Sequence, residues 1–384
     1  MSHAAPRRDR AMTIADPLPE DAGAACLVGR AWLDDGPSLV TLRDGMMVDI
    51  TAAGPTMADL LAGGDPAAAV RGAPGRVLGP PGEILGRLLA PVDLQAIKAA
   101  GVTFAASMVE RVIEEQAKGD PSRAEAIRAA IGAEIGRDLS GIRPGSPEAE
   151  RLKAALIGRG LWSQYLEVGI GPDAEIFTKA QPMSAVGHGA AIGIHPVSAW
   201  NNPEPELVLV IAPDGRIVGV TLGNDVNLRD VEGRSALLLG KAKDNNASCA
   251  IGPFIRLFDE RYTLDDARAA EITLRVEGED GFVLDGRSSL KAISRDLADL
   301  AAQAIGPHHQ YPDGLVLFTG TLFAPVQDRD GPGKGFTHHL GDRVLIASPR
   351  LGRLENRVTR TDHAPPWTFG ARALMRNLAG RGLL

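Results

Sequence analysis

The most constraining stretch of the sequence is the apolar run 207–211, "LVLVI", which follows Glu204, Pro205 and Glu206. The run does not alternate with polar residues, which predicts a strand buried on both faces. Residues two apart in a strand project to the same face, so Glu204 and Glu206 should point together. Proline cannot donate to a ladder, so Pro205 marks the start or edge of the strand. The fold must therefore contain a doubly buried strand with two carboxylates at its head.

Two neighbouring carboxylates in such a place repel each other and resist desolvation. A divalent cation would relieve both effects, and Asp225 offers a third carboxylate on the return strand of a hairpin predicted around "PDG" at 213–215. Carboxylate oxygens on neighbouring strands suit a hard cation such as Mg²⁺. The residues alone leave a plainer alternative open. The glutamates can be the wet face of a half-exposed strand, and Asp225 with Arg229 an ordinary loop ion pair.

The distribution of residue types divides the chain into regions. We expect a disordered leader over 1–20, a small N-terminal domain of short strands over 21–92, and a catalytic domain over 93–384. Residues 105–165 are rich in Ala, Glu, Arg and Leu at helical spacing, which predicts a helical insert broken by turns. Strands and hairpins resume after 166, with one more helix expected at about 288–304. The whole is an α+β, β-rich protein.

Composition excludes several classes of function. The 384 residues carry 41 Lys and Arg against 48 Asp and Glu, a net charge of −7, which argues against a nucleic-acid binder. No apolar run reaches the length of a membrane helix, and the first residues lack the apolar core of a secretory signal. Cys26 and Cys249 are the only cysteines and make no disulfide framework or zinc site. A cytoplasmic enzyme of small molecules is expected.

Several segments, in order, resemble the fumarylacetoacetate hydrolase superfamily. They are "TKAQPMSAVGHG", "PEPELVLVI", "GVTLGNDVNLRD", "GKAKDNNASCAIGPFI", "LFTGTLFAP" and "GDRVLIASPRLGRLENRV". Each motif is weak, whereas the ordered set, running from about residue 100 to 358, is specific. The resemblance implies a fumarylacetoacetate hydrolase-like mixed β-sandwich or β-roll catalytic domain, and by family habit a homodimer or homotetramer.

The resemblance also assigns roles by matching position. It implies that Glu204, Glu206 and Asp225 bind Mg²⁺ or Mn²⁺ and that Lys243 is the active-site lysine. Its substrate-side residues fall at Ser184, Arg229, Thr321 and His338. The other paired histidines, His308, His309 and His339, are interpreted as solvated loop residues rather than metal ligands.

One position departs from the family's C–C hydrolases, which carry an H-x-x-E dyad near the start of the catalytic domain. Glu110 matches the glutamate, but Ser107 stands where the histidine is expected. A serine without a partner base cannot activate water near neutral pH. Together with the helical insert and the glycine-rich loop after Thr321, this is similar to the sugar-acid branch, the 2-keto-3-deoxy-D-pentonate dehydratases. The resemblance thus implies dehydration of a 2-oxo sugar acid to 2,5-dioxopentanoate.

Dehydration needs a base near C3 and an acid near the C4 hydroxyl. Lys243, with its pKa lowered beside a cation, or a carboxylate at 110–115 is the hypothesis for these groups, and Glu110 and Glu114 share a helix face by their spacing. A solvated helix face is the plainer interpretation of that pair. Two other functions stay open: a Mg²⁺-dependent hydrolase or decarboxylase of an acylpyruvate-type acid, which Ser107 disfavours, and a sugar-acid-binding regulator without activity.

Overall fold

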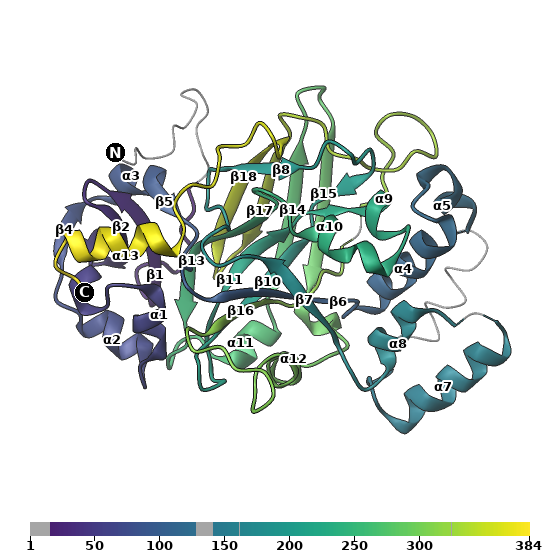
Figure 1. Cartoon of the computed structure of the whole chain (residues 1–384), viewed down its shortest axis with the longest axis horizontal. Coiled ribbons are helices and arrows are strands. Elements are labelled where there is room, and N and C mark those ends of the chain that lie inside the picture. The colour runs from purple at the N-terminus through teal and green to yellow at the C-terminus, as the bar shows by residue number, and fades with distance from the viewer. Residues whose placement is uncertain (1–15, 128–140, 161, 324) are drawn as a thin grey trace.

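The computed structural model describes residues 16–127, 141–160, 162–323 and 325–384. An eleven-stranded sheet runs through the molecule in the order β4-β3-β2-β1-β13-β11-β10-β16-β6-β7, and β5 pairs with β1 (Figure 1). Its strands are β1 (Leu27–Leu33), β2 (Gly36–Arg43), β3 (Met46–Asp49), β4 (Arg76–Gly79), β5 (Leu88–Leu89), β6 (Ala96–Gly101), β7 (Glu175–Ala180), β10 (Pro205–Ile211), β11 (Ile217–Asp225), β13 (Cys249–Leu257) and β16 (Leu315–Phe318).

The doubly buried strand predicted from the sequence is β10, and the prediction is confirmed. Every residue of β10 is buried, because it lies between β11 and β16 inside the sheet and both faces of the sheet are covered around it. The turn at 213–215 joins β10 to β11 as expected, and the antiparallel register places Pro205 opposite Asn224. This register brings the two carboxyl-bearing strand ends to one edge.

A second sheet of five strands packs against the first. Its order is β15-β14-β17-β18-β8, and it contains β8 (Ala191–Ile194), β14 (Glu271–Glu277), β15 (Val283–Ser289), β17 (Arg343–Ser348) and β18 (Gly352–Arg360). Leu207 and Leu209 of β10 share one apolar core with Leu274 of β14 and Ile346 of β17. The core of the predicted sandwich therefore lies between these sheets. A two-stranded ribbon, β9 (Asn201–Asn202) with β12 (Asn227–Leu228), lies apart from both sheets.

The helices of the insert lie together at one end of the molecule (Figure 1). They are α4 (Ala105–Ala117), α5 (Pro121–Ile127), α7 (Pro147–Gly158) and α8 (Gln164–Ile170). Met108, Val112 and Ile113 on one side of α4 pack with Leu166 of α8 in a separate apolar core. The opposite side of α4 is thereby left to face the strand ends that carry the carboxylates.

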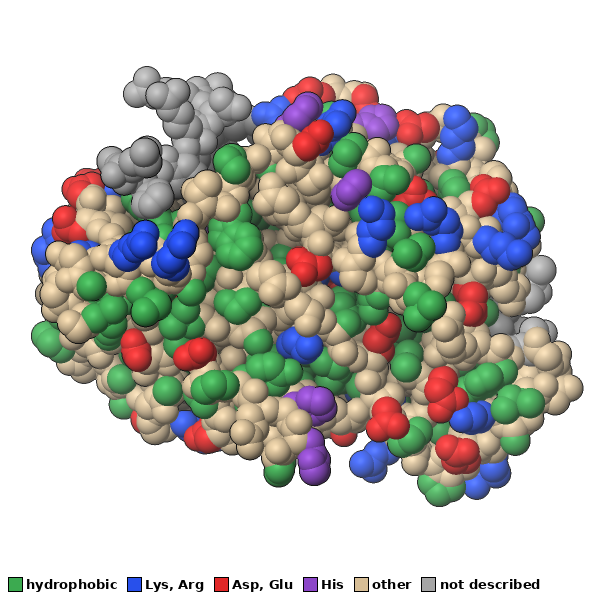
Figure 2. Space-filling view, viewed as in Figure 1, with side chains coloured by type: hydrophobic (Ala, Val, Ile, Leu, Met, Phe, Trp, Pro, Cys, Tyr) green, Lys and Arg blue, Asp and Glu red, His purple; other side chains and the backbone are tan. Residues whose placement is uncertain are grey.

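Short helices cover the rest of the molecule. They are α1 (Met57–Ala62), α2 (Pro66–Gly72), α3 (Pro81–Ile84), α9 (Arg229–Glu232), α10 (Leu239–Lys243), α11 (Leu264–Arg268), α12 (Leu297–Ala304) and α13 (Ala371–Gly380). The C-terminal α13 lies against the N-terminal strands (Figure 1), where Asn377 Nδ2 donates to the Asp35 carbonyl at 2.7 Å. No helix of the described residues is long and apolar enough to span a lipid bilayer. Acidic and basic side chains both occur across the face shown in Figure 2.

The α+β, β-rich architecture with a helical insert agrees with the sequence. The helix expected at about 288–304 is shorter: residues up to Ser289 belong to β15, and α12 begins only at Leu297, where the Asp296 side chain accepts from the Ala298 amide. Of the leader predicted over 1–20, residues 1–15 lie outside the described residues, whereas the Pro17 carbonyl accepts from the Arg353 amide. Strand β1 pairs with β13, so the predicted N-terminal region extends the large sheet. The boundary at residue 92 stays a prediction.

Truncating β10 in its core tests this account of the fold. Leu209→Ala removes a fully buried side chain between the sheets, so we expect a loss of about 2–5 kcal/mol in the free energy of unfolding. Urea denaturation followed by circular dichroism measures it. Leu237→Ala is the control, because Leu237 is 95% exposed and its truncation should change stability by less than about 0.5 kcal/mol. Equal effects of the two substitutions would contradict the assignment of β10 to the core.

Candidate functional site

The three predicted metal ligands meet at the ends of β10 and β11. Glu204 immediately precedes β10, Glu206 lies within it, and Asp225 ends β11. The Asp225 amide donates to the Glu204 carbonyl at 3.0 Å, which fixes the two segments side by side. One carboxylate oxygen from each residue lies within 4.8 Å of the others, and all three residues are buried. The geometry brings three hard oxygen donors to one point, as a divalent cation such as Mg²⁺ requires.

Each of these carboxylates has one oxygen bound by a donor from elsewhere in the fold. Glu204 Oε1 accepts from Arg111 Nη2 at 2.6 Å, and Asp225 Oδ1 lies 2.8 Å from Lys179 Nζ. Glu206 Oε2 accepts from the Gly320 backbone amide at 2.6 Å. The donors belong to α4, β7 and the loop after β16, so the site is assembled by tertiary structure.

The electrostatics of the three carboxyls are unequal. Burial, reinforced by the negative charges of Asp225 and Glu204, raises the pKa of Glu206 well above its usual value. Burial opposes ionisation of Asp225 too, but Lys179 and Lys243 lower its pKa below the usual range. The raised pKa of Glu206 shows that the nearby cationic side chains do not fully compensate the three carboxylates. A bound cation would stabilise the ionised form of Glu206. The donor set therefore fits a divalent cation, and its residues would be Glu204, Glu206 and Asp225.

Lys243, at the end of α10, also reaches this point. Its ammonium is ion-paired with Glu204 and lies 2.9 Å from Asp225 Oδ2. Burial disfavours its charged form, but the carboxylates of Asp225 and Glu204 outweigh that effect and raise the pKa of Lys243 above its usual value. The direction is opposite to the lowered pKa expected from the sequence. Among these carboxylates, Lys243 is held in its ammonium form.

A small cavity opens beside the triad. Its wall contains Lys243 and Thr321, as predicted, and several residues to which the sequence assigned no role. The lining residues are Ala100, Gly101, Val102, Ser107, Arg111, Glu175, Phe177, Glu204, Glu206, Asp225, Glu232, Lys243, Gly320 and Thr321. Within the described residues, no histidine lines this cavity. A substrate here would meet three strand-borne acids on one side and α4 on the other.

Glu175 is a residue of the cavity wall whose carboxyl group has a pKa near neutral pH. It begins β7, opposite Gly101 of β6, and a Cβ at Gly101 would lie 2.0 Å from Glu175 Oε2, so a side chain there would force the carboxyl group out of its present position. Burial, then the negative charge of Glu232, raises the pKa of Glu175 to about 7. A carboxyl group that titrates near neutral pH can exchange protons with a substrate.

A periodic signal for Glu175 was present in the sequence. Glu175 and Phe177 alternate along β7 and both line the cavity, which is the same two-residue period that indicated the pair Glu204 and Glu206. Lys179 is fully buried; its Nζ also donates to the Val226 and Lys243 carbonyls at 3.0 and 2.5 Å. The sequence does not predict that β7 lies beside the site, because no neighbouring residue indicates that β7 pairs with β6.

The hydroxyl of Ser107 has no partner base in the part of the chain that the structure describes and binds the backbone of its own helix instead. Ser107 occupies the first turn of α4, and its Oγ donates to the Phe104 carbonyl at 2.8 Å and accepts from the Phe104 amide at 3.3 Å. Its hydroxyl lines the cavity while binding its own helix terminus. Ser107 is thus suited to contact a hydroxyl group of a ligand and not to abstract a proton.

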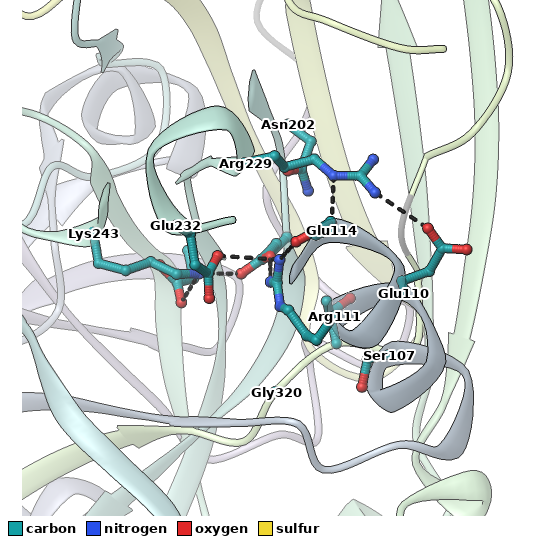
Figure 3. Close-up of polar contacts among 12 residues, drawn as sticks. Ser107, Glu110, Arg111, Glu114, Asn202, Arg229, Glu232, Lys243 and Gly320 are labelled. Carbon is teal, nitrogen blue, oxygen red and sulfur yellow. Dashed lines mark hydrogen bonds and ion pairs between the residues drawn. The ribbon is translucent and has the colours of Figure 1, made fainter. Parts of the chain in front are cut away.

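Glu110 and Glu114 of α4 form an ion cluster with Arg229 of α9 beside the cavity (Figure 3). Arg229 Nε donates to Glu114 Oε1 at 2.7 Å, and its Nη2 lies 3.2 Å from Glu110 Oε2. Arg229 also donates to the Pro325 carbonyl at 3.0 Å and stacks over Trp200 at 4.3 Å. Burial opposes ionisation of Glu114, but the two arginines beside it lower its pKa. None of the three predicted residues lines the cavity, so their contacts are those of an anchor between α4, α9 and the loop after β16.

Two predicted substrate-side residues lie away from the cavity wall. Ser184 Oγ donates to the Gln181 carbonyl at 2.7 Å on a partly exposed loop. His338 is buried, with Nδ1 3.1 Å from Asp342 Oδ2, and burial lowers its pKa. Among the described residues, the structure therefore brings together five of the predicted site residues, Glu204, Glu206, Asp225, Lys243 and Thr321.

Comparison with known proteins gives concordant matches. A family model described as "Fumarylacetoacetate (FAA) hydrolase C-terminal" matches residues 164–359. The chain is 33% identical over 195 residues to a probable 2-keto-3-deoxyxylonate dehydratase of Haloferax volcanii and 33% identical over 181 residues to 2-dehydro-3-deoxy-D-arabinonate dehydratase of Saccharolobus solfataricus. These matches cover 51% and 47% of this chain but only 63% and 58% of the relatives. The matched part of the chain thus spans less than two thirds of the length of each of these two relatives.

Solved structures agree in fold over more of the chain. A 2-keto-3-deoxy-D-arabinonate dehydratase complexed with magnesium and 2,5-dioxopentanoate superposes with a TM-score of 0.60 at 22% identity, covering 87% of this chain and 99% of that one. A fumarylacetoacetate hydrolase from Exiguobacterium antarcticum gives 0.54 at 19% identity, with coverage of 87% and 99%. At these identities the structures establish a shared fold, and the predicted fold class is confirmed.

Removing one carboxylate tests the metal site. We expect Glu206→Gln to weaken Mg²⁺ binding by more than about tenfold, because loss of even an outer partner of a metal ligand commonly costs that much. Isothermal titration with Mg²⁺ and with Mn²⁺ measures it. Glu277→Gln is the control, since Glu277 is paired with Arg275 and Arg343 on the second sheet. Unchanged affinity in Glu206→Gln would show that the cation binds elsewhere.

Proposed function

Because the chain belongs to the fumarylacetoacetate hydrolase family, as its motifs predicted, we propose that it is a metal-dependent hydro-lyase that converts a 2-keto-3-deoxy-D-pentonate to 2,5-dioxopentanoate. The observation that carries this proposal is the cavity itself. It combines a carboxylate triad and a lysine with a serine at the position of the hydrolytic histidine. That donor set can polarise a 2-oxo acid and move protons without an activated water.

The named relatives support the substrate class. Two are a probable 2-keto-3-deoxyxylonate dehydratase and a 2-dehydro-3-deoxy-D-arabinonate dehydratase, and a structure of the latter type holds magnesium and 2,5-dioxopentanoate. Both names describe the same 2-keto-3-deoxy-D-pentonate, which has an oxo group at C2, no hydroxyl at C3 and a hydroxyl at C4. Loss of water across C3 and C4 followed by migration of the double bond towards C5 gives an enol, which becomes the aldehyde.

A cation bound by Glu204, Glu206 and Asp225 would supply Lewis-acid polarisation of the 2-oxo group, which acidifies the C3 protons. The polypeptide does the rest. The hydroxyl of Thr321 lies at the same wall and can orient the substrate carboxylate. Ser107 lies on the wall formed by α4 and can accept a hydrogen bond from a distal hydroxyl.

The proton transfers fall to two groups with different acidities. Glu175, with its pKa raised to about 7 by burial, is ionised often enough near neutral pH to take a proton from C3. Lys243, whose pKa the adjacent carboxylates raise, holds a proton that can pass to the departing C4 hydroxyl, which then leaves as water. In this scheme Glu175 replaces Glu110 and Glu114, since both of those carboxylates are bound to Arg229.

The experiment that tests the function presents purified protein and Mg²⁺ with a panel of 2-keto-3-deoxy acids and with acylpyruvates. A coupled aldehyde dehydrogenase detects 2,5-dioxopentanoate, and loss of ultraviolet absorbance detects acylpyruvate cleavage. We expect aldehyde from the 2-keto-3-deoxypentonates alone. Cleavage of acylpyruvates or release of CO₂ without dehydration would instead assign a hydrolase or decarboxylase, and binding without turnover a regulator.

Removing the Lys243 amine separates chemistry from assembly. We expect Lys243→Met to lower kcat by at least about a hundredfold, the usual contribution of a positioned acid. Mg²⁺ affinity should persist, because the three carboxylates remain. Steady-state turnover and isothermal titration measure the two effects. Lys241→Met, on the exposed side of the same short helix, is the matched control. Near-normal turnover in Lys243→Met would remove Lys243 from the mechanism.

The acidity of Glu175 predicts a pH profile. If Glu175 acts as the base, its carboxylate must be ionised, so kcat/KM should rise as pH increases through about 7 and level off above it. Glu175→Gln should abolish this limb and lower kcat by at least about a hundredfold. Initial rates measured from about pH 5.5 to about pH 9, roughly one to two units either side of the pKa, test this profile. A rate that instead falls through about pH 7 would assign Glu175 as the acid.

A further inference from the structure

Arg111 is the link between the helical insert and the metal ligands. Its guanidinium leaves α4 and reaches Glu204 Oε1 through Nη2 at 2.6 Å. Its Nη1 donates to Glu114 Oε2 at 2.6 Å and lies 3.1 Å from Glu232 Oε2. The side chain is only 13% exposed. One planar group thus binds carboxylates from α4, from the segment before β10 and from α9.

This contact is rigid for two reasons. A guanidinium is planar and its N–H donors have fixed directions. The contacts of Arg111 with Glu114 and Glu232 therefore fix the direction of its hydrogen bond to Glu204. The two partners other than Glu204 are buried, and Glu114 is itself held by Arg229. Burial disfavours the charge, but Glu114, Glu232 and Glu204 raise the pKa of Arg111 well above its usual value.

The consequence concerns which oxygens can face a cation. With Oε1 bound to Arg111, Glu204 presents only Oε2, the atom that Lys243 also approaches. At Asp225, Lys179 lies beside Oδ1 and Lys243 beside Oδ2, and at Glu206 the Gly320 amide binds Oε2. Each of the three carboxylates thus has one oxygen held by a group other than Lys243. Mg²⁺ requires a compact octahedron of single oxygens, whereas Ca²⁺ accepts bidentate carboxylates and more ligands.

We propose that Arg111 is a positioning residue that restricts Glu204 to one ligand oxygen and thereby makes the site selective for Mg²⁺ over Ca²⁺. The proposal rests on the metal dependence of the proposed function but goes beyond it. It also gives the helical insert a role, since α4 carries the residue that shapes the coordination sphere. Without Arg111, Glu204 Oε1 loses its donor and can join Oε2 as a ligand of a larger ion.

Metal titrations test this without reference to turnover. We expect Arg111→Met to weaken Mg²⁺ binding by about 10–100-fold, as for other outer partners of metal ligands. Ca²⁺ binding should weaken less or strengthen, so the ratio of the Mg²⁺ and Ca²⁺ dissociation constants should rise by about tenfold or more. Arg111→Lys keeps the charge but loses the fork and should lie between the wild type and Arg111→Met. If Arg111→Met does not fold, Arg111→Lys decides the question.

A matched control separates selectivity from general damage. Arg295 is also a buried arginine, but its donors go to the carbonyls of Val168 and Gly171, away from the metal ligands. Arg295→Met should lower the melting temperature and leave the Mg²⁺ to Ca²⁺ ratio unchanged. An unchanged ratio in folded Arg111 variants, or a wild type without preference for Mg²⁺, overturns the Arg111 proposal.

The same preparations keep this result separate from the proposed function. Wild-type protein that dehydrates a 2-keto-3-deoxypentonate while the Arg111 variants keep the wild-type ratio contradicts only the positioning role. Wild-type protein that prefers Mg²⁺, loses the preference in the Arg111 variants and yet dehydrates none of the acids contradicts only the proposed reaction.

Discussion

The structure depends on the burial of three carboxylates at one edge of a hairpin. Glu204, Glu206 and Asp225 lie within 4.8 Å of one another with almost no contact with solvent. Like charges at this distance in a poorly polarisable interior raise each other's free energy of ionisation. The cations that compensate them come from separate parts of the chain: Arg111 from α4, Lys179 from β7 and Lys243 from α10. The requirement for charge compensation thus draws distant elements to the same point.

The sheet makes this arrangement possible because β10 is buried on both faces. A strand covered by the second sheet on one side and by the N-terminal core on the other cannot slip in register without exposing apolar residues such as Leu209 and Val210. A fixed register holds Glu206 opposite Gly223 and Asp225 beside the Glu204 backbone. The apolar run therefore fixes the relative positions of the three carboxylates at the start of the strand.

The sequence predicted those features that depend on local geometry. The alternation of Glu204 and Glu206, the turn at 213–215 and the helices of the insert follow from periods and turn chemistry that neighbouring residues determine. The spacing of Glu110 and Glu114 correctly placed them on one face of α4, where both bind Arg229. Spacing along a helix says which residues share a face, but only tertiary packing decides what that face meets. Glu175, Lys179 and Arg111 were missed for the same reason.

Ser107 shows how one fold can support different reactions. The family's hydrolases, by resemblance, place a histidine at this position of α4, beside the substrate and with a glutamate one turn later. Here the hydroxyl of Ser107 binds the Phe104 backbone and the glutamate, Glu110, is bound to Arg229. The wall formed by α4 is thereby left with Arg111 as its charged group, which orders the metal ligands. Glu175 on β7 and Lys243 on α10 line the same cavity. In the proposed reaction, acid–base groups on these two elements instead of on α4 would decide which atom of a bound 2-oxo acid loses a proton, while the carboxylate triad stays the same.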